Sequence, residues 1–146
     1  MAALGDPLRA VALSFARLGT AATTETGPRE VLRSMADHPF MVGGTGRLCT
    51  RLAETTRGEL IGKLGAEGVY GITMPGEGLG LAMKVEDGGI RAGDPAVIRA
   101  LDELSLLGGE AAEALEPFRR PSIRNSRGER VGELYGTFPL RRGVAT

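Results

Sequence analysis

Three short extended runs in the middle of the chain limit most strongly what this sequence can fold into. The runs are residues 59–65, 68–74 and 79–85. Turns rich in glycine separate them, and from Leu79 to Val85 apolar residues alternate with small or polar ones. That period is typical of a strand with one buried face. Adjacent strands joined by tight turns predict an antiparallel meander.

The two faces of these strands are expected to differ. Tyr70 and Ile72 share one face of the second strand, together with Met74, and we expect this face to be apolar. On the third strand the opposite face carries Gly80 and Lys84. We expect that second face to be exposed to solvent.

Two helices are predicted before the strands. Asp6 and Pro7 can begin the first helix, and Gly19 can end it in a left-handed conformation. The second helix is expected to begin at Pro28. It should end before Pro39, because the residue preceding a proline disfavours the helical region.

A third helix is predicted over about residues 45–56, with a buried face. That face comprises Leu48, Cys49, Leu52 and Ala53. Asp94 and Pro95 repeat the helix-start signal, and the helix that follows is expected to end at Gly108. A short helix over 111–115, a turn at 125–128 and a last strand at 131–134 complete the chain. Together these elements predict an α+β fold, an antiparallel sheet flanked by helices within one domain over residues 1–146.

Charge and composition exclude several classes of function. Lysine and arginine together number 18, as do aspartate and glutamate, so the net charge is zero. Nothing in this balance favours nucleic acid or an anionic membrane as a partner. No apolar run is long enough to span a bilayer. The single cysteine and single histidine exclude an internal disulfide, make a metal site in this chain unexpected and favour a cytoplasmic location.

The segment at residues 63–68, Lys-Leu-Gly-Ala-Glu-Gly, is the strongest candidate for chemistry. Lys63 near the end of a strand can project into a cleft, while Gly65 lets a substrate approach the backbone closely. Serine β-lactamases use a Lys-Thr-Gly strand in this way together with a Ser-x-x-Lys nucleophile. Without that context, a solvated strand lysine is the more frequent explanation.

The glycine-rich segment at residues 42–47 precedes the third predicted helix. Backbone N–H groups of Gly44 and Thr45 could bind an anion there, and Arg47 could add a charge-assisted hydrogen bond to a carboxylate. The segment matches neither a Walker A loop nor a dinucleotide-binding fingerprint. Taken alone, a tight turn with Thr45 as the helix N-cap is the more frequent explanation.

No nucleophile with its base can be assembled from this sequence. None of its serines is followed by lysine three residues later, and His38 has no evident serine or cysteine partner. Cys49 lies on the apolar face of a predicted helix, where a buried structural thiol is expected.

Three segments in order resemble the L-asparaginase II family, the Rhizobium etli type of L-asparaginase. They are residues 38–47, residues 63–72 and the strand that ends at Lys84 with its Asp87-Gly88 turn. Residues 7–16 resemble a preceding helix of the family, and residues 125–132 resemble its C-terminus. The combination is specific, although each motif by itself is not.

The resemblance implies hydrolysis of L-asparagine to L-aspartate and ammonia on a fold similar to serine β-lactamases and glutaminases. It places Lys63 at the family's strand lysine, which works with a second serine, and it makes Cys49 a family cysteine that is not a metal ligand. The family also has a Ser-x-x-Lys pair and a zinc site with cysteine and lysine ligands. These upstream motifs are not found in this sequence, so we expect a partial, C-terminal domain with no cofactor of its own.

Two alternatives of other classes remain open. The chain could be one subunit of a split enzyme that requires a separate N-terminal half. It could instead be a non-catalytic remnant that binds a small amino acid through its glycine-rich loop. In either case, uncovered apolar surface would favour self-association, and a homo-oligomer is a possible state.

Overall fold

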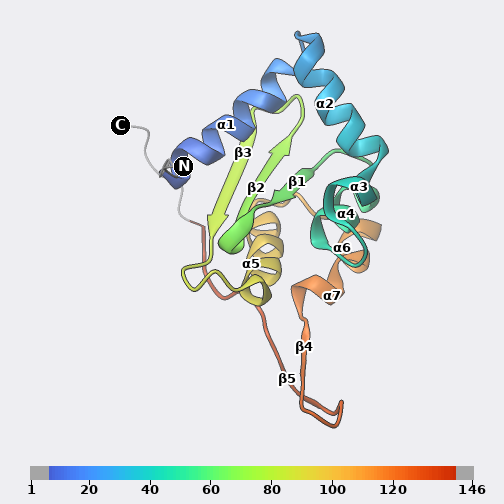
Figure 1. Ribbon diagram of the computed structural model, residues 1–146, viewed down its shortest axis with the longest axis vertical. Helices are drawn as coiled ribbons and strands as arrows, with labels where there is room; N and C mark the ends of the chain where they lie inside the picture. Colours follow the sequence, from blue (N-terminus) through green and yellow to red (C-terminus); the bar gives the residue numbers. More distant parts are fainter. Residues whose placement is uncertain (1–6, 141–146) are drawn as a thin grey trace.

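The computed structural model of the protein describes residues 7–140, in which groups of helices lie before and after the strands of a central sheet (Figure 1). The helices are α1 (Leu8–Ala21), α2 (Thr26–Asp37), α3 (Pro39–Gly43), α4 (Leu48–Thr55), η1 (Ala66–Gly68), α5 (Ile90–Glu103), α6 (Gly109–Ala114) and α7 (Glu116–Arg119). The strands are β1 (Ile61–Leu64), β2 (Val69–Met74), β3 (Leu79–Lys84), β4 (Ser122–Arg124) and β5 (Arg130–Glu133). Within residues 7–140 no helix combines the length and the apolar character needed to cross a membrane.

The central sheet is the predicted antiparallel meander. Its strand order is β1-β2-β3, and both pairings are antiparallel. In this register Lys63 lies opposite Gly71, and Tyr70 lies opposite Met83. The α+β class and the three strands are therefore confirmed, with ends that differ by one or two residues from those predicted.

The main core lies between one face of the sheet and helices α4 and α5. Tyr70 and Ile72 of β2 are buried there, as the strand pattern predicted. The predicted apolar face of the third helix is also buried in full. The other large side chains of this core are Leu48, Leu52, Leu60, Val97, Ile98, Leu101 and Leu115. Each is almost fully removed from water, so this core supplies much of the hydrophobic stabilisation of the fold.

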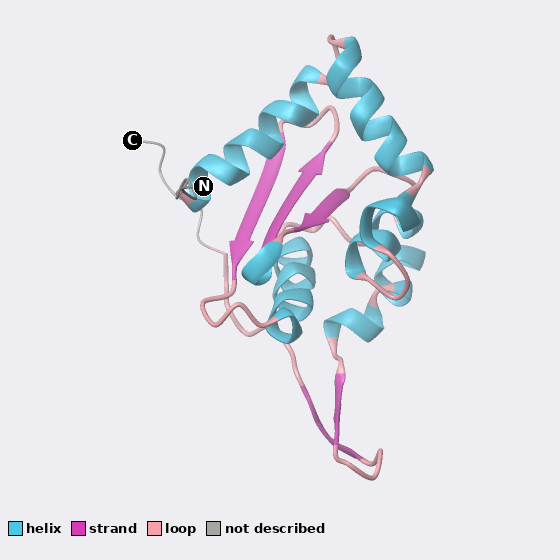
Figure 2. Cartoon of the chain, viewed as in Figure 1, coloured by secondary structure: helices cyan, strands magenta, loops and turns pink. Residues whose placement is uncertain are grey.

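The second face of the sheet is covered by α1, and the expectation that it is exposed was wrong for Gly80. Helix α1 lies beside β3 in Figures 1 and 2, and it also contacts β2. A Cβ atom on Gly80 would collide with the carbonyl oxygen of Ala12 and lie 2.5 Å from the nitrogen of Ala16. A Cβ on Gly71 would collide with the ring of Phe15. These glycines let the helix backbone lie directly on the strands, whereas only Lys84 at the strand end is exposed.

Two predicted helix boundaries were wrong for the same reason, a close tertiary contact. Gly19 does not end α1 but lies buried inside it, where a Cβ would collide with Thr73 of β2. Asp94 and Pro95 do not begin a helix; they lie within α5, which starts four residues earlier at Ile90 and ends at Glu103. The predicted cap at Asp6 lies outside the described residues.

The glycine-rich segment also differs from its prediction. Thr45 is not a helix N-cap, because α4 begins only at Leu48 and its first turn has no side-chain cap. A short helix, α3, precedes the turn, and Thr50 Oγ1 donates a hydrogen bond to the carbonyl oxygen of Gly44 at 2.8 Å. A Cβ at Gly43 would lie 2.6 Å from Thr50 Oγ1, so this glycine permits α3 to pack closely on α4.

The last strands form a two-stranded hairpin that extends away from the body of the molecule (Figure 2). The predicted turn is confirmed: Asn125 Oδ1 accepts hydrogen bonds from the backbone nitrogens of Arg127 and Glu129, each at 3.0 Å. At the base of the hairpin, Arg119 pairs with Asp102 at 2.9 Å and so joins α7 to α5.

Candidate functional site

A small cavity of about 130 Å³ forms where the loop before α4 meets β1, β2 and α5. It is lined by Val42, Gly43, Arg47, Leu48, Cys49, Lys63, Leu64, Tyr70 and Asp94. Five helices and strands contribute to it, together with the loop residue before α4, and three of the lining residues carry a charge. Such convergence of polar groups in a concave site is the usual mark of a ligand site.

Two cations that the sequence analysis selected meet at this cavity. Lys63 extends from the exposed side of β1, and its Nζ donates a hydrogen bond to the carbonyl oxygen of Leu64 at 2.7 Å. Arg47 immediately precedes α4. Among the described residues, neither cation forms an ion pair with a carboxylate within 4.0 Å. Both positive charges are thus available to an anionic or amide-bearing ligand.

Tyr70 and Asp94 add a carboxylate that the sequence analysis missed. The Tyr70 hydroxyl donates a hydrogen bond to Asp94 Oδ1. Gly93 makes this contact possible, because a Cβ there would lie 2.8 Å from the Tyr70 ring. The sequence pattern places Tyr70 only on an apolar strand face and Asp94 only at a helix start. The buried tyrosine in an otherwise aromatic-poor chain was the one available signal, since its hydroxyl needs a partner.

Burial decides the protonation of this pair. It raises the pKa of the Tyr70 hydroxyl far above its ordinary value, and the adjacent Asp94 carboxylate raises it further. Burial also raises the pKa of Asp94, although the Tyr70 hydrogen bond and the positive charge of Arg47 act in the opposite direction. A carboxylate whose pKa stays raised, because its neighbours do not fully offset the cost of burial, is typical of functional sites.

Cys49 lines the cavity and is almost fully buried, as predicted. Burial raises the pKa of its thiol, and this effect exceeds the opposing influence of the Leu64 backbone and the charge of Lys63. The thiol therefore stays protonated at neutral pH, and it packs as a small apolar group.

Three further residues selected from the sequence do not line this cavity. Gly44 adopts a left-handed φ of 88° in the turn after α3, and Thr45 is exposed in the same turn. The backbone nitrogen of Gly65 donates to the carbonyl oxygen of Val69 at 2.7 Å and so closes the loop between β1 and β2. Their part in substrate binding stays a prediction.

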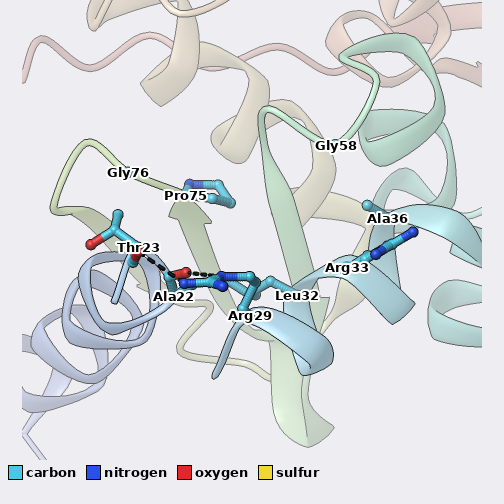
Figure 3. Close-up of a pocket in the computed structure, with 9 residues that line it drawn as sticks. All are labelled: Ala22, Thr23, Arg29, Leu32, Arg33, Ala36, Gly58, Pro75 and Gly76. Carbon is cyan, nitrogen blue, oxygen red and sulfur yellow. Dashed lines mark hydrogen bonds between the residues drawn. The ribbon is translucent and has the colours of Figure 1, made fainter. Parts of the chain in front are cut away.

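A larger cavity of about 350 Å³ lies between α1, α2 and the turn after β2 (Figure 3). Its main polar group, Arg29, donates hydrogen bonds to the carbonyl oxygens of Ala22 and Thr23, each at 3.0 Å. Arg33 pairs with Asp37 at 3.5 Å. The hydrogen bonds of Arg29 join α2 to the end of α1, and the Arg33 pair lies within α2, so both guanidinium groups already have partners.

The L-asparaginase II family model matches residues 1–135. This chain belongs to the L-asparaginase II family. Its function is accordingly related to that of asparaginases, and the resemblance noted at residues 38–47 and 63–72 is confirmed at the level of the family. Among curated proteins, none matches the sequence.

The zinc site of the L-asparaginase II family does not fit the residues described here. Its ligands are cysteine and lysine, whereas the only cysteine of this chain, Cys49, is buried with a protonated thiol. Within residues 7–140, no three histidine, cysteine, aspartate or glutamate side chains lie close enough together to hold a metal ion.

Proposed function

We propose that this chain forms the lysine-bearing side of an L-asparaginase active site, where L-asparagine is hydrolysed to L-aspartate and ammonia. One observation carries the proposal: Lys63 and Arg47 converge on a single small cavity in a member of the L-asparaginase II family. Lys63 matches the strand lysine of the family. Arg47 offers a planar guanidinium, which suits the carboxylate of an amino acid.

The reaction class is acyl transfer to water. A serine hydroxyl attacks the side-chain amide, ammonia leaves, and water then hydrolyses the acyl-enzyme. In this proposal Lys63 moves a proton at the nucleophile, and Arg47 orients the substrate. Because the sequence has no Ser-x-x-Lys pair, we place the nucleophile on a segment outside this sequence or on a second chain. A cytoplasmic location, expected from the single cysteine, belongs to the same proposal.

The test is ammonia release from L-asparagine by the purified chain, alone and mixed with an N-terminal half of a family member. We expect no turnover from the chain alone and turnover in the mixture. Lys63→Ala should then reduce the rate by about 100-fold or more, the order of magnitude lost when a positioned acid or base is removed. Lys84→Ala is the matched control, because Lys84 is another exposed strand lysine but donates to the Glu67 carbonyl away from the cavity.

Each result separates the candidate functions. Turnover by the chain alone, at equal rates with and without Lys63, would contradict the proposal. If a folded sample binds L-asparagine but releases no ammonia in any mixture, the result would instead support a non-catalytic binding protein. Analytical ultracentrifugation of the same samples would distinguish a heteromeric complex from a homo-oligomer.

A further inference from the structure

The cavity that holds Lys63 and Arg47 also contains one carboxylate, and its position suggests which part of a substrate it meets. Asp94 lies on α5, across the cavity from the loop that carries Arg47. The two side chains influence each other electrostatically but form no ion pair within 4.0 Å. The space between a guanidinium and a carboxylate is therefore open to a ligand that carries both charges.

We propose that Asp94 accepts the α-ammonium group of a free amino acid whose α-carboxylate is bound by Arg47. This inference rests on the proposed function and deepens it, because it makes a free α-amino group a requirement for binding. Lys63, the third charged side chain at the cavity, then faces the side-chain amide.

Tyr70 is the positioning residue in this arrangement. Its hydroxyl donates a hydrogen bond to Oδ1 of Asp94, whereas no described residue donates one to Oδ2. Among the described residues, every buried side-chain oxygen has a hydrogen-bond partner. Oδ2 has none, so it must be accessible to solvent or to a ligand. One carboxylate oxygen is thus fixed by the fold while the other remains accessible, as an ammonium ligand requires.

The size of the cavity agrees with a small zwitterion. At about 130 Å³ it is well below the roughly 300–1,000 Å³ of sites for drug-sized molecules. A residue within a peptide lacks both free α-groups, so it would leave Arg47 and Asp94 without partners. Asp94 is half-buried, and a carboxylate left without a partner in such a position disfavours ligands that lack the ammonium group.

Asp94 also borders a second cavity, of about 260 Å³, beside α7. An ammonium group that reached Asp94 from that side would lie near Arg91 rather than Arg47. Arg91→Gln is therefore the matched control for Arg47→Gln, since both variants remove a guanidinium close to the same carboxylate.

The experiment is calorimetric titration of the full chain with L-asparagine and with succinamate, which has the same carboxylate and amide but no α-amino group. Wild-type chain should bind L-asparagine at least tenfold more tightly. Asp94→Asn should remove this preference and leave succinamate binding unchanged. Tyr70→Phe should reduce the preference for L-asparagine by a smaller factor. Arg47→Gln should lower the affinity for both ligands, whereas Arg91→Gln should leave both affinities unchanged.

Three results would overturn the inference. The first is that a folded wild-type chain does not bind L-asparagine. The second is that this chain binds L-asparagine and succinamate with equal affinity. The third is that Asp94→Asn lowers the affinity for both ligands by the same factor. The last result would assign Asp94 a structural role only. Failure to hydrolyse L-asparagine in any mixture would count against the proposed function, but an intact preference for the α-amino group would leave this inference standing.

Discussion

Asp94 is the residue whose environment carries the most information about this molecule. It lies near the start of α5, is half-buried and has only Tyr70 as a hydrogen-bond donor among the described residues. Burial raises the pKa of the carboxyl group more than Tyr70 and Arg47 lower it. The ionised form is consequently a net cost to the fold, which is a common property of residues retained for ligand binding.

Replacement of Asp94 by asparagine should reveal this cost as a pH dependence. Below the unfolded-state pKa of about 3.8, the wild-type carboxyl is protonated in both states and contributes nothing. As pH rises through the raised folded-state pKa, ionisation lowers the free energy of unfolding. Urea unfolding at pH 3 and pH 7 should therefore show Asp94→Asn to be relatively more stable at pH 7. A stability difference that is independent of pH would contradict the expectation.

The Cys49 thiol should be inert in the native protein. Its raised pKa reduces the thiolate fraction, and its side chain is only 3% exposed. Labelling by a thiol-specific disulfide reagent should be slower than in the unfolded chain by about 100-fold or more. Mass spectrometry of timed samples measures both rates, and equal rates would show that α4 opens readily beneath the cavity.

At the scale of elements, the contact between α1 and the sheet decides how the molecule is assembled. Gly71 and Gly80 lie on the sheet face that α1 covers, and Gly19 lies on the helix face that meets β2. The close approach comes from glycine on both sides of the interface. This is why a strand face that looked polar and small in sequence became an internal packing surface.

Substitution of Gly80 by alanine should separate α1 from β3. The new Cβ would meet the backbone of Ala12 and Ala16, which cannot rotate away as a side chain can. We expect a loss of about 1–3 kcal/mol in the free energy of unfolding, the usual range for overpacking. Gly27→Ala is the matched control, since a Cβ there meets no atom within 4 Å and alanine favours helix. Chemical denaturation of the two variants makes the comparison, and equal stability would contradict this packing.

At the scale of the whole molecule, the core between the sheet, α4 and α5 supports both the fold and the site. Lys63 and Asp94 lie on β1 and α5, and Arg47 directly precedes α4; all three elements contribute to this core. Their separation therefore depends on packing that lies beneath them. Phe40 and Met41 on α3 remain exposed, at 58% and 81%, which keeps self-association an expectation for the isolated chain.

Truncation of the core should damage fold and site together. Leu101→Ala removes a fully buried side chain of α5 and should lower the free energy of unfolding by about 2–5 kcal/mol. Leu13→Ala, at a position 46% exposed on α1, should cost much less. Urea unfolding monitored by circular dichroism measures both. Similar losses at the two positions would mean that the core is not centred on α5.

Much of the architecture followed from local pattern. Alternation at residues 79–85 and the turns at Gly76, Gly78 and Gly128 identified the strands and hairpins, because strand period and positive φ are properties of a few adjacent residues. The buried face of α4 followed from helical spacing for the same reason. The family was also recognisable from motif order alone.

The candidate site was predicted only in part. Lys63 and Arg47 stood out because their neighbours in the chain are distinctive, and the fold brings both to one cavity. Tyr70 and Asp94 are 24 residues apart and meet only through the packing of α5 on β2. A local pattern contains no signal for such a pair.

The sequence by itself determined the class of fold, the meander, the main helices and the family, since each depends on neighbouring residues or on their order. Only the tertiary structure decided that Gly19 lies inside a helix, that Asp94 is not a cap and that Gly80 is covered. In each case a contact between distant segments outweighed a local preference of about 1 kcal/mol or less. Packing in three dimensions is what brought two cations and an unpredicted carboxylate to a single cavity.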